Sequence, residues 1–212
     1  MNYRYIFWDN DGVLVDTERY YLQASKEALA RVGIQLGDEQ FAEISLTAGR
    51  SIFDIAATSG ISVQSIAELK KWRNRRYAGL LEQAEITMDG AVDVLIHLHG
   101  RVGMAVVTSS QRLHFEIIHR RTGFLPYFDF CLTREDYVSS KPSAEPYLLA
   151  LKQCGHAAED VLVIEDSPRG LKAAKAAGLA CWVIPAQHTS AQDFAEADRV
   201  LSNIREVMLL TL

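Results

Sequence analysis

The sequence predicts an α/β fold, in which helices flank a parallel sheet and a helical segment is inserted after the first strand. From residue 87 onward, short apolar runs alternate with helical stretches, whereas residues 17–86 contain almost no strand-like run. Alternating strands and helices are typical of a parallel sheet with helices on both faces. We therefore divide the chain into a core of residues 1–16 and 87–212 and a helical domain of residues 17–86.

The core strands are expected where apolar residues run without interruption, as a sheet covered on both faces requires. These runs are residues 3–8, 102–107, 128–132, 161–164 and 180–184. The helical stretches between and after them are residues 91–99, 111–121, 145–153 and 168–177. Ser167 and Pro168 are typical of a helix cap followed by a first helical residue, so they begin the last helix.

The helical domain is expected because the apolar residues of this segment recur at helical spacing. Examples are Leu22, Leu29 and Val32, then Ile52, Ile55 and Ala56, then Ile66, Leu69 and Trp72. The basic run at residues 70–76 falls in the last of these helices, and we expect it to form a solvent-exposed face.

Composition and charge limit the classes of partner. The chain has 212 residues and a net charge of −5, which offers no general attraction to nucleic acid or anionic membranes. No apolar stretch approaches the ~20 residues of a membrane-spanning helix, and no signal peptide precedes the first strand. The three cysteines are scattered, which indicates reduced thiols. We expect a cytoplasmic monomer that binds neither nucleic acid nor membrane.

Two acidic residues follow the first strand. Asp9 and Asp11 are two positions apart and lead into Gly12, so on extended backbone they can point to the same side. Carboxylates this close repel each other unless a hard cation such as Mg²⁺ binds between them. The pair therefore suggests a magnesium site. The alternatives are a solvated strand end or a hairpin turn at Asp11 and Gly12.

In such a sheet, ligands bind beyond the carboxyl ends of the strands. The second strand is followed by Thr108, Ser109 and Ser110 just before a helix, where a hydroxyl and backbone N–H groups suit a phosphate oxygen. The alternative is that Ser109 or Ser110 is only the cap of that helix.

Two further segments carry charged residues near strand ends. Pro142 holds Lys141 in extended backbone, so that its ammonium can neutralise a phosphoryl group, although an exposed surface lysine is the alternative. The fourth strand ends in Glu165 and Asp166. Asp166 can complete an oxygen shell for Mg²⁺, with Glu165 supporting it.

Four segments match, in order, the four motifs of the haloacid dehalogenase superfamily. They are Asp9-Asn10-Asp11-Gly12-Val13, Thr108-Ser109, Lys141-Pro142 and Glu165-Asp166-Ser167. Their spacing and the helical insert resemble the branch with a C1 cap, which includes sugar-phosphate phosphatases and β-phosphoglucomutase. The resemblance covers essentially the whole chain. It implies the superfamily's Rossmann-like core, with residues 17–86 as an inserted α-helical C1 cap domain.

The resemblance also implies a role for each motif. Asp9 is the nucleophile that accepts the phosphoryl group, and Asp11 protonates the leaving alcohol and then activates water. The Asp9 side chain, the Asp11 backbone carbonyl and the Asp166 side chain hold Mg²⁺.

The phosphate and the rest of the substrate are expected to meet further residues of the family pattern. Lys141 stabilises the transferring oxygens, which Thr108, Ser109 and the amides around Asn10 also bind. Arg50 lies between two expected cap helices, where related caps place a substrate-contacting loop. The alternative for Arg50 is an exposed side chain at a helix start.

Asp11 and Tyr21 narrow the expected activity. An acid at the position of Asp11 favours phosphate-ester chemistry over dehalogenation. Tyr21 stands where β-phosphoglucomutases carry histidine. We therefore expect a phosphatase acting on a small phosphorylated metabolite, in particular a sugar phosphate. A hexose-phosphate mutase is the alternative enzyme, and a binding protein that keeps the fold without turnover is the alternative from another class.

Overall fold

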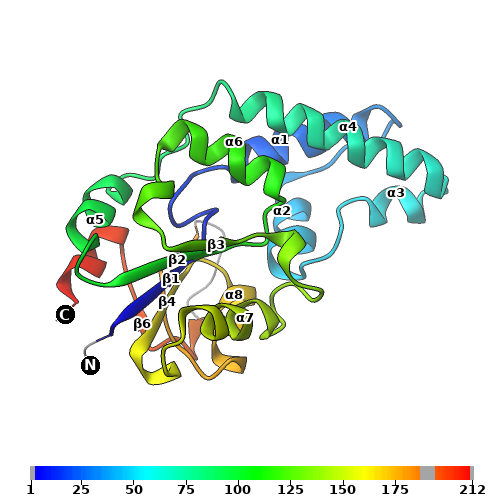
Figure 1. Cartoon of the computed structure of the whole chain (residues 1–212). Coiled ribbons are helices and arrows are strands. Elements are labelled where there is room, and N and C mark those ends of the chain that lie inside the picture. Colours follow the sequence, from blue (N-terminus) through cyan, green and yellow to red (C-terminus); the bar gives the residue numbers. More distant parts are fainter. Residues whose placement is uncertain (1–2, 187–193, 211–212) are drawn as a thin grey trace. The chain divides into compact units, whose positions relative to one another are not determined.

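The structure, a computed structural model, describes residues 3–186 and 194–210. The chain divides into a core unit, residues 1–16 with 86–212, and a helical unit, residues 17–85 (Figure 1). Ile86, expected in the insert, belongs to the core unit, where its carbonyl accepts a hydrogen bond from Asp16 N–H at 2.8 Å. That the helical unit acts as a cap stays a prediction.

The core unit is built on a parallel sheet with strand order β3-β2-β1-β4-β5-β6. The strands are β1 Tyr5–Trp8, β2 Gly103–Val107, β3 Phe130–Leu132, β4 Val161–Glu165, β5 Ala180–Val183 and β6 Arg199–Val200. The first five lie within or overlap the apolar runs that predict strands, so the parallel α/β sheet is confirmed. The sequence does not indicate β6, because it is only two exposed residues long.

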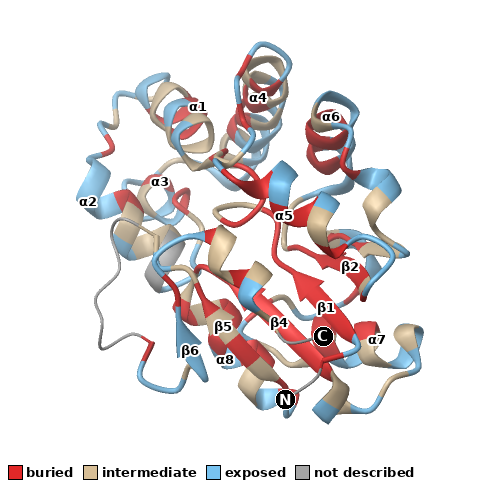
Figure 2. Ribbon diagram, turned by 90° about the vertical axis from the view of Figure 1, so that its left-hand side faces the viewer, coloured by how far each residue is buried: buried red, intermediate tan, exposed pale blue. Residues whose placement is uncertain are grey.

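Helices cover both faces of this sheet. They are α5 Ala91–Leu98, α6 Arg112–Thr122, α7 Glu145–Cys154 and α8 Pro168–Ala176. Helices α5 and α6 lie on one face and α7 and α8 on the other (Figure 1), which leaves the central strands β1, β2 and β4 almost wholly buried (Figure 2). The strand order reverses at β1, whose neighbours are β2 and β4. The carboxyl ends of β1 and β4 therefore meet at the topological switch point, where ligands bind in such sheets.

The face under α7 and α8 shows how burial positions the strands. Phe7 on β1 stacks on Tyr147 of α7 with ring centroids 6.4 Å apart, and both side chains are fully buried. Val163 of β4 and Leu171 of α8 join the same cluster. Each fully buried apolar side chain of this size stabilises the fold by about 1.5–3 kcal/mol. Packing thus fixes β1 and β4, the two strands that end at the switch point.

The helical unit contains α1 Glu18–Ala30, α2 Asp38–Phe41, a π-helical turn Ala42–Thr47, α3 Asp54–Thr58 and α4 Val63–Leu81. Its core consists of Ala28, Leu29, Leu36, Phe41, Ile52, Phe53, Ala56 and Leu69. Four of these, Leu29, Ile52, Ala56 and Leu69, are among the residues at helical spacing that the sequence shows, and the other five pack against this core partly buried. Among the described residues of the whole chain, no helix is both long and apolar enough to cross a membrane.

The basic run on α4 is only partly the exposed face that the sequence predicts. Lys70, Lys71 and Arg75 are exposed, but Arg73 is 9% exposed. Its guanidinium carbon lies 4.3 Å from the ring centre of Tyr21 and 5.5 Å from that of Phe53. The planar guanidinium can stack on aromatic faces, which lets this cation enter the core of the unit.

Gly170 on α8 gives a test of how tightly that helix packs on the sheet. An alanine Cβ here would lie 1.8 Å from the Glu165 carboxyl carbon, so we expect Gly170→Ala to destabilise the protein by about 1–3 kcal/mol. The control is Gly79→Ala on α4, where no atom lies within 4 Å of the added Cβ. It should stabilise its helix by up to about 1 kcal/mol. Urea unfolding measures both, and a gain in stability for Gly170→Ala would contradict the packing.

Candidate active site

The loop after β1 brings the first motif toward the end of β4. Gly12 has φ +87°, and a Cβ at this position would lie 1.9 Å from Asp166 Oδ2. Only glycine therefore allows this close approach. The hairpin interpretation is wrong, because β1 pairs in parallel with β2 and β4 rather than with the segment after Gly12.

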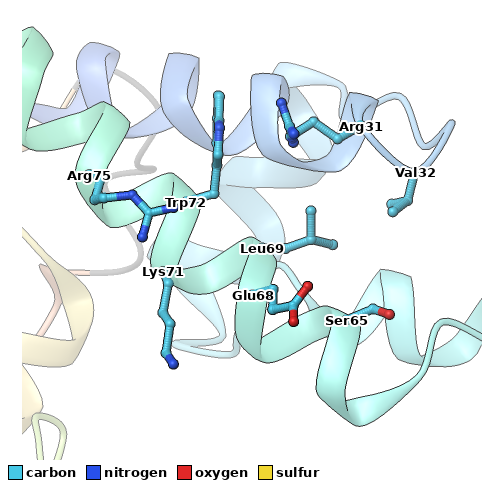
Figure 3. Close-up of a pocket in the computed structure, with 8 residues that line it drawn as sticks. All are labelled: Arg31, Val32, Ser65, Glu68, Leu69, Lys71, Trp72 and Arg75. Atoms are coloured by element: carbon cyan, nitrogen blue, oxygen red, sulfur yellow. The ribbon is translucent and has the colours of Figure 1, made fainter.

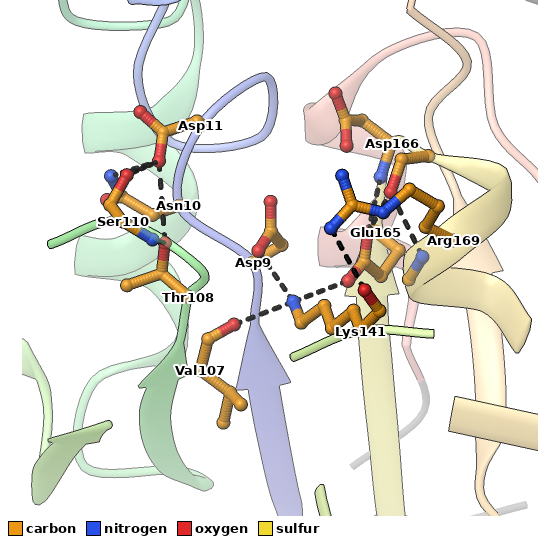
Figure 4. Close-up of polar contacts among 12 residues, drawn as sticks. Asp9, Asn10, Asp11, Val107, Thr108, Ser110, Lys141, Glu165, Asp166 and Arg169 are labelled. Carbon is orange, nitrogen blue, oxygen red and sulfur yellow. Dashed lines mark hydrogen bonds and ion pairs between the residues drawn. The ribbon is translucent and has the colours of Figure 1, made fainter. Parts of the chain in front are cut away.

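Lys141 lies at the centre of the polar contacts among the ends of the strands. Its Nζ donates to Asp9 Oδ1 at 2.7 Å, to Val107 O at 2.8 Å and to Glu165 Oε1 at 2.6 Å (Figure 4). Lys141 is only 5% exposed, so the exposed-lysine interpretation is wrong. The three acceptors come from the ends of β1, β2 and β4 and fix the ammonium beside Asp9.

Glu165 is fully buried, and both of its carboxylate oxygens accept two hydrogen bonds. Its Oε1 also accepts from Tyr147 Oη at 2.7 Å, while its Oε2 accepts from Asp166 N at 3.3 Å and from Ser167 Oγ at 3.1 Å. Ser167 caps α8 as predicted, accepting from Gly170 N at 3.1 Å. With these contacts made, Glu165 is suited to support the site and not to bind a ligand directly.

Three carboxylates could hold a cation. Asp9, Glu165 and Asp166 each offer an oxygen, and these atoms lie within 4.8 Å of one another. Carboxylate oxygens supplemented by water and phosphate suit the octahedral preference of Mg²⁺. The donor set therefore fits the metal that the sequence suggests.

The charges of this cluster explain why a cation fits. Burial raises the pKa of Asp9 to about 7; Lys141 opposes this shift and Glu165 adds to it. Burial also disfavours the Lys141 ammonium, but Asp9 and Glu165 outweigh it and raise the pKa of Lys141. Lys141 is therefore cationic. One ammonium does not balance three ionised carboxylates, so a divalent cation lowers the energy of the ionised cluster.

Asp11 belongs to a different set of contacts. Its Oδ2 accepts from Ser110 Oγ at 2.6 Å, from Asn10 Nδ2 at 3.2 Å and from Thr108 Oγ1 at 3.4 Å (Figure 4). The Asp11 carboxylate is not a member of the three-carboxylate cluster. The alternation that would align it with Asp9 does not apply, because β1 ends at Trp8.

The serines after β2 have a different role from helix capping. Helix α6 begins at Arg112 with Gln111 as its cap residue, so the interpretation of Ser109 or Ser110 as the cap is wrong. Ser110 instead binds Asp11. The Ser109 Oγ is buried and has no hydrogen-bond partner among the described residues. Its part in binding a phosphate oxygen stays a prediction.

Asn10 also contacts His119, which the sequence does not predict. His119 on α6 is 1% exposed, and its Nε2 lies 2.9 Å from Asn10 Oδ1. Two sequence signals point to it in retrospect. Asn10 is a polar residue two positions after a buried strand, and His119 follows Phe115 by one helical turn on the apolar face of its helix.

The helical unit holds Arg50, which is exposed between the π-helical turn and α3. Its part in substrate binding stays a prediction. The same unit has a groove between α4 and the residues that follow α1, and it contains none of the predicted site residues (Figure 3). The groove is lined by Arg31, Val32, Ser65, Glu68, Leu69, Lys71, Trp72 and Arg75.

Curated proteins resemble this chain over nearly its full length. It is 31% identical to validoxylamine A 7'-phosphate phosphatase of Streptomyces hygroscopicus subsp. limoneus, covering 97% of this chain and 96% of that protein. It is 30% identical to protein CbbY of Cereibacter sphaeroides, covering 95% and 93%.

The fold has close counterparts among solved structures. A mutant of CbbY from Rhodobacter sphaeroides in complex with xylulose-(1,5)-bisphosphate superposes with a TM-score of 0.83 at 28% identity, over 96% of each chain. The model of the haloacid dehalogenase-like hydrolase family matches residues 6–184, a range that contains all four motifs. The chain belongs to the haloacid dehalogenase-like hydrolase family.

Proposed function

We propose that this protein is a Mg²⁺-dependent phosphatase that hydrolyses a phosphate monoester of a small metabolite, with the phosphoryl group carried transiently on Asp9. The observation that carries the proposal is the position of Asp9 at the switch point. Its Oδ1 lies 2.7 Å from the Lys141 ammonium, and it shares a cluster with Asp166. A carboxylate placed in this way is a nucleophile beside the charges that phosphoryl transfer requires.

In the first step, an Asp9 carboxylate oxygen attacks phosphorus and the bond from phosphorus to the alcohol oxygen breaks. Like charge opposes this attack, and Lys141 lowers the repulsion because its ammonium is fixed within hydrogen-bonding distance of Asp9. Bound Mg²⁺, held by Asp9, Asp166 and the Asp11 carbonyl, would supply a second positive charge to the phosphate oxygens. Asp11 gives its proton to the departing alcohol.

In the second step, Asp11 takes a proton from water as the water oxygen attacks phosphorus. The bond between phosphorus and Asp9 then breaks, which regenerates the carboxylate and releases inorganic phosphate. The hydrogen bonds of Asp11 to Ser110 and Thr108 keep its carboxyl group at one position through both steps. The Ser109 hydroxyl and the amides around Asn10 are the proposed ligands of the other phosphate oxygens.

A sugar phosphate is the proposed substrate class. The support comes from the relatives, which include a validoxylamine 7'-phosphate phosphatase and a CbbY crystallised with xylulose bisphosphate. Arg50 is the proposed contact to the rest of the substrate. Tyr21 packs on Phe41 and Tyr77, with ring centroids 6.1 and 5.3 Å away, in place of the mutase histidine. Hydrolysis therefore remains favoured over the mutase alternative.

Asp9→Asn tests the nucleophile. We expect Mg²⁺-dependent phosphate release from a panel of sugar phosphates by the wild type, and a loss of about 10³-fold or more in the variant. An amide cannot form the acyl phosphate. Melting temperature should be unchanged or higher, because the substitution removes one of three crowded carboxylates. Phosphate release is measured with Mg²⁺ and with EDTA.

The outcomes of this test separate the alternatives. Appreciable turnover by a folded Asp9→Asn variant would exclude Asp9 as the nucleophile. No release from any ester by the wild type would contradict the phosphatase proposal. The next assay would then be β-glucose 1-phosphate with a bisphosphate primer, which tests the mutase alternative.

Asp166→Asn tests the metal site separately from turnover. We expect calorimetry to show Mg²⁺ binding weakened about tenfold or more, because a neutral amide replaces a charged oxygen ligand. The control is Asp89→Asn, whose carboxylate is 90% exposed and pairs with Arg205 outside the cluster. Equal Mg²⁺ affinity in the wild type and Asp166→Asn would place the metal elsewhere.

A further inference from the structure

We propose that His119 is a positioning residue for Asp11 and acts through the side chain of Asn10. The three side chains form a hydrogen-bonded series in space: His119 Nε2 is 2.9 Å from Asn10 Oδ1, and Asn10 Nδ2 is 3.2 Å from Asp11 Oδ2. The inference rests on the proposed function, in which Asp11 transfers protons. It adds a residue of α6 that does not touch the substrate.

His119 is held in an apolar pocket, which determines its protonation state. Its ring centroid lies 4.2 Å from that of Phe115, 6.1 Å from Phe124 and 6.4 Å from Phe128. Burial lowers the pKa of His119 to about 4, although the negative charge of Asp11 opposes the shift. The imidazole is therefore neutral at physiological pH. One ring nitrogen donates a hydrogen bond and the other accepts one.

The contact with Asn10 determines which ring nitrogen carries the proton. The hydroxyl of Thr122 accepts from Phe124 N–H at 3.4 Å and lies 3.3 Å from His119 Nδ1. A hydroxyl can donate to Nδ1 or accept from it, so Thr122 suits either tautomer, whereas Asn10 Oδ1 faces Nε2 and can only accept a hydrogen bond. The proton of His119 then resides on Nε2, which donates to Asn10 Oδ1.

The Asp11 carboxylate selects the orientation of the Asn10 amide, and His119 stabilises that orientation by donating to Asn10 Oδ1. The oxygen of Asn10 faces His119, so its NH₂ group faces the Asp11 carboxylate. In the flipped orientation the amide oxygen would face the carboxylate, and the two oxygens would repel each other. Asn10 is fully buried, so water cannot readily replace a missing partner. Each donor in the series thus depends on the one before it.

The orientation matters because three donors converge on one oxygen of Asp11. Ser110 Oγ at 2.6 Å and Thr108 Oγ1 at 3.4 Å come from the loop after β2, whereas the Asn10 amide comes from the loop after β1. Together they limit rotation of the carboxyl group. Displacing a reacting group by about 1 Å can reduce turnover about 100-fold. Releasing the Asn10 amide should therefore reduce kcat more than substrate binding.

His119→Leu and His119→Gln distinguish positioning from simple packing. Leucine fills space but has no N–H, whereas the glutamine amide can donate to Asn10 as Nε2 does. We expect His119→Leu to lower kcat about 10- to 100-fold with KM within about twofold. We expect His119→Gln to retain kcat within about threefold of the wild type. Ile118→Val, a buried change on the same helix, is the control for loss of packing.

Asn10→Leu and the double variant provide a second measurement. If His119 acts only through Asn10, the double variant Asn10→Leu/His119→Leu should lose no more kcat than Asn10→Leu alone. Melting temperatures of all variants show whether they are folded. Additive losses in the double variant would overturn the proposal, because they would mean independent roles.

A spectroscopic readout keeps the inference testable apart from turnover. In a two-bond ¹H–¹⁵N NMR spectrum of histidine-labelled wild type, His119 should be the neutral form with its proton on Nε2 between pH 5 and 8. A proton on Nδ1, or a charged ring, would overturn the proposal whether or not the protein is a phosphatase. Unchanged kcat in His119→Leu, or equal losses in His119→Leu and Ile118→Val, would overturn it while leaving the phosphatase assignment intact.

Discussion

The ion pair between Lys141 and Glu165 is the constraint on which the site depends. Burying either charge alone costs several kcal/mol, and the pair is tolerated because its hydrogen bonds are satisfied. Glu165 is contacted by Lys141, by Tyr147 of α7 and by Ser167 at the start of α8. One carboxylate thus joins β4 to two helices and a loop. Since Lys141 in turn donates to Asp9, the position of the proposed nucleophile follows from a residue that does not react.

Two environments meet at the end of β1. Asp9 faces an ionic cluster, in which the Lys141 ammonium balances part of the carboxylate charge and a bound cation would balance more. Asp11 faces hydroxyls and an amide, a set of neutral donors around one oxygen. The two carboxylates diverge because β1 ends at Trp8, so strand alternation does not align them. In the proposed reaction, the environment of Asp9 stabilises the charge of the phosphate, and the environment of Asp11 positions the group that transfers the proton. Neither acid must therefore do both.

The sequence predicts the parts of this arrangement that are local. Continuous apolar runs identify the strands, and polar residues directly after them, such as Asp9 and Asp166, indicate the candidate site, because parallel strands end at one edge of the sheet. Contacts between distant segments were not predictable in this way. The burial of Arg73 depends on the rings of Tyr21 and Phe53, and the contact of His119 with Asn10 depends on how α6 packs on the sheet. Periodicity gives the face of a helix but not its partner.

The junction between the two units has a consequence for how such proteins can diversify. The chain leaves the core after Asp16 and returns at Ile86, and a hydrogen bond of 2.8 Å joins these two residues. Val15 and Thr87 pair beside them in antiparallel fashion. Because the two ends of the insert are already held together by the core, closing a longer or shorter insert costs little additional entropy. The intervening segment can therefore be lengthened, shortened or exchanged during evolution as a module, while Asp9 and Lys141 keep their places.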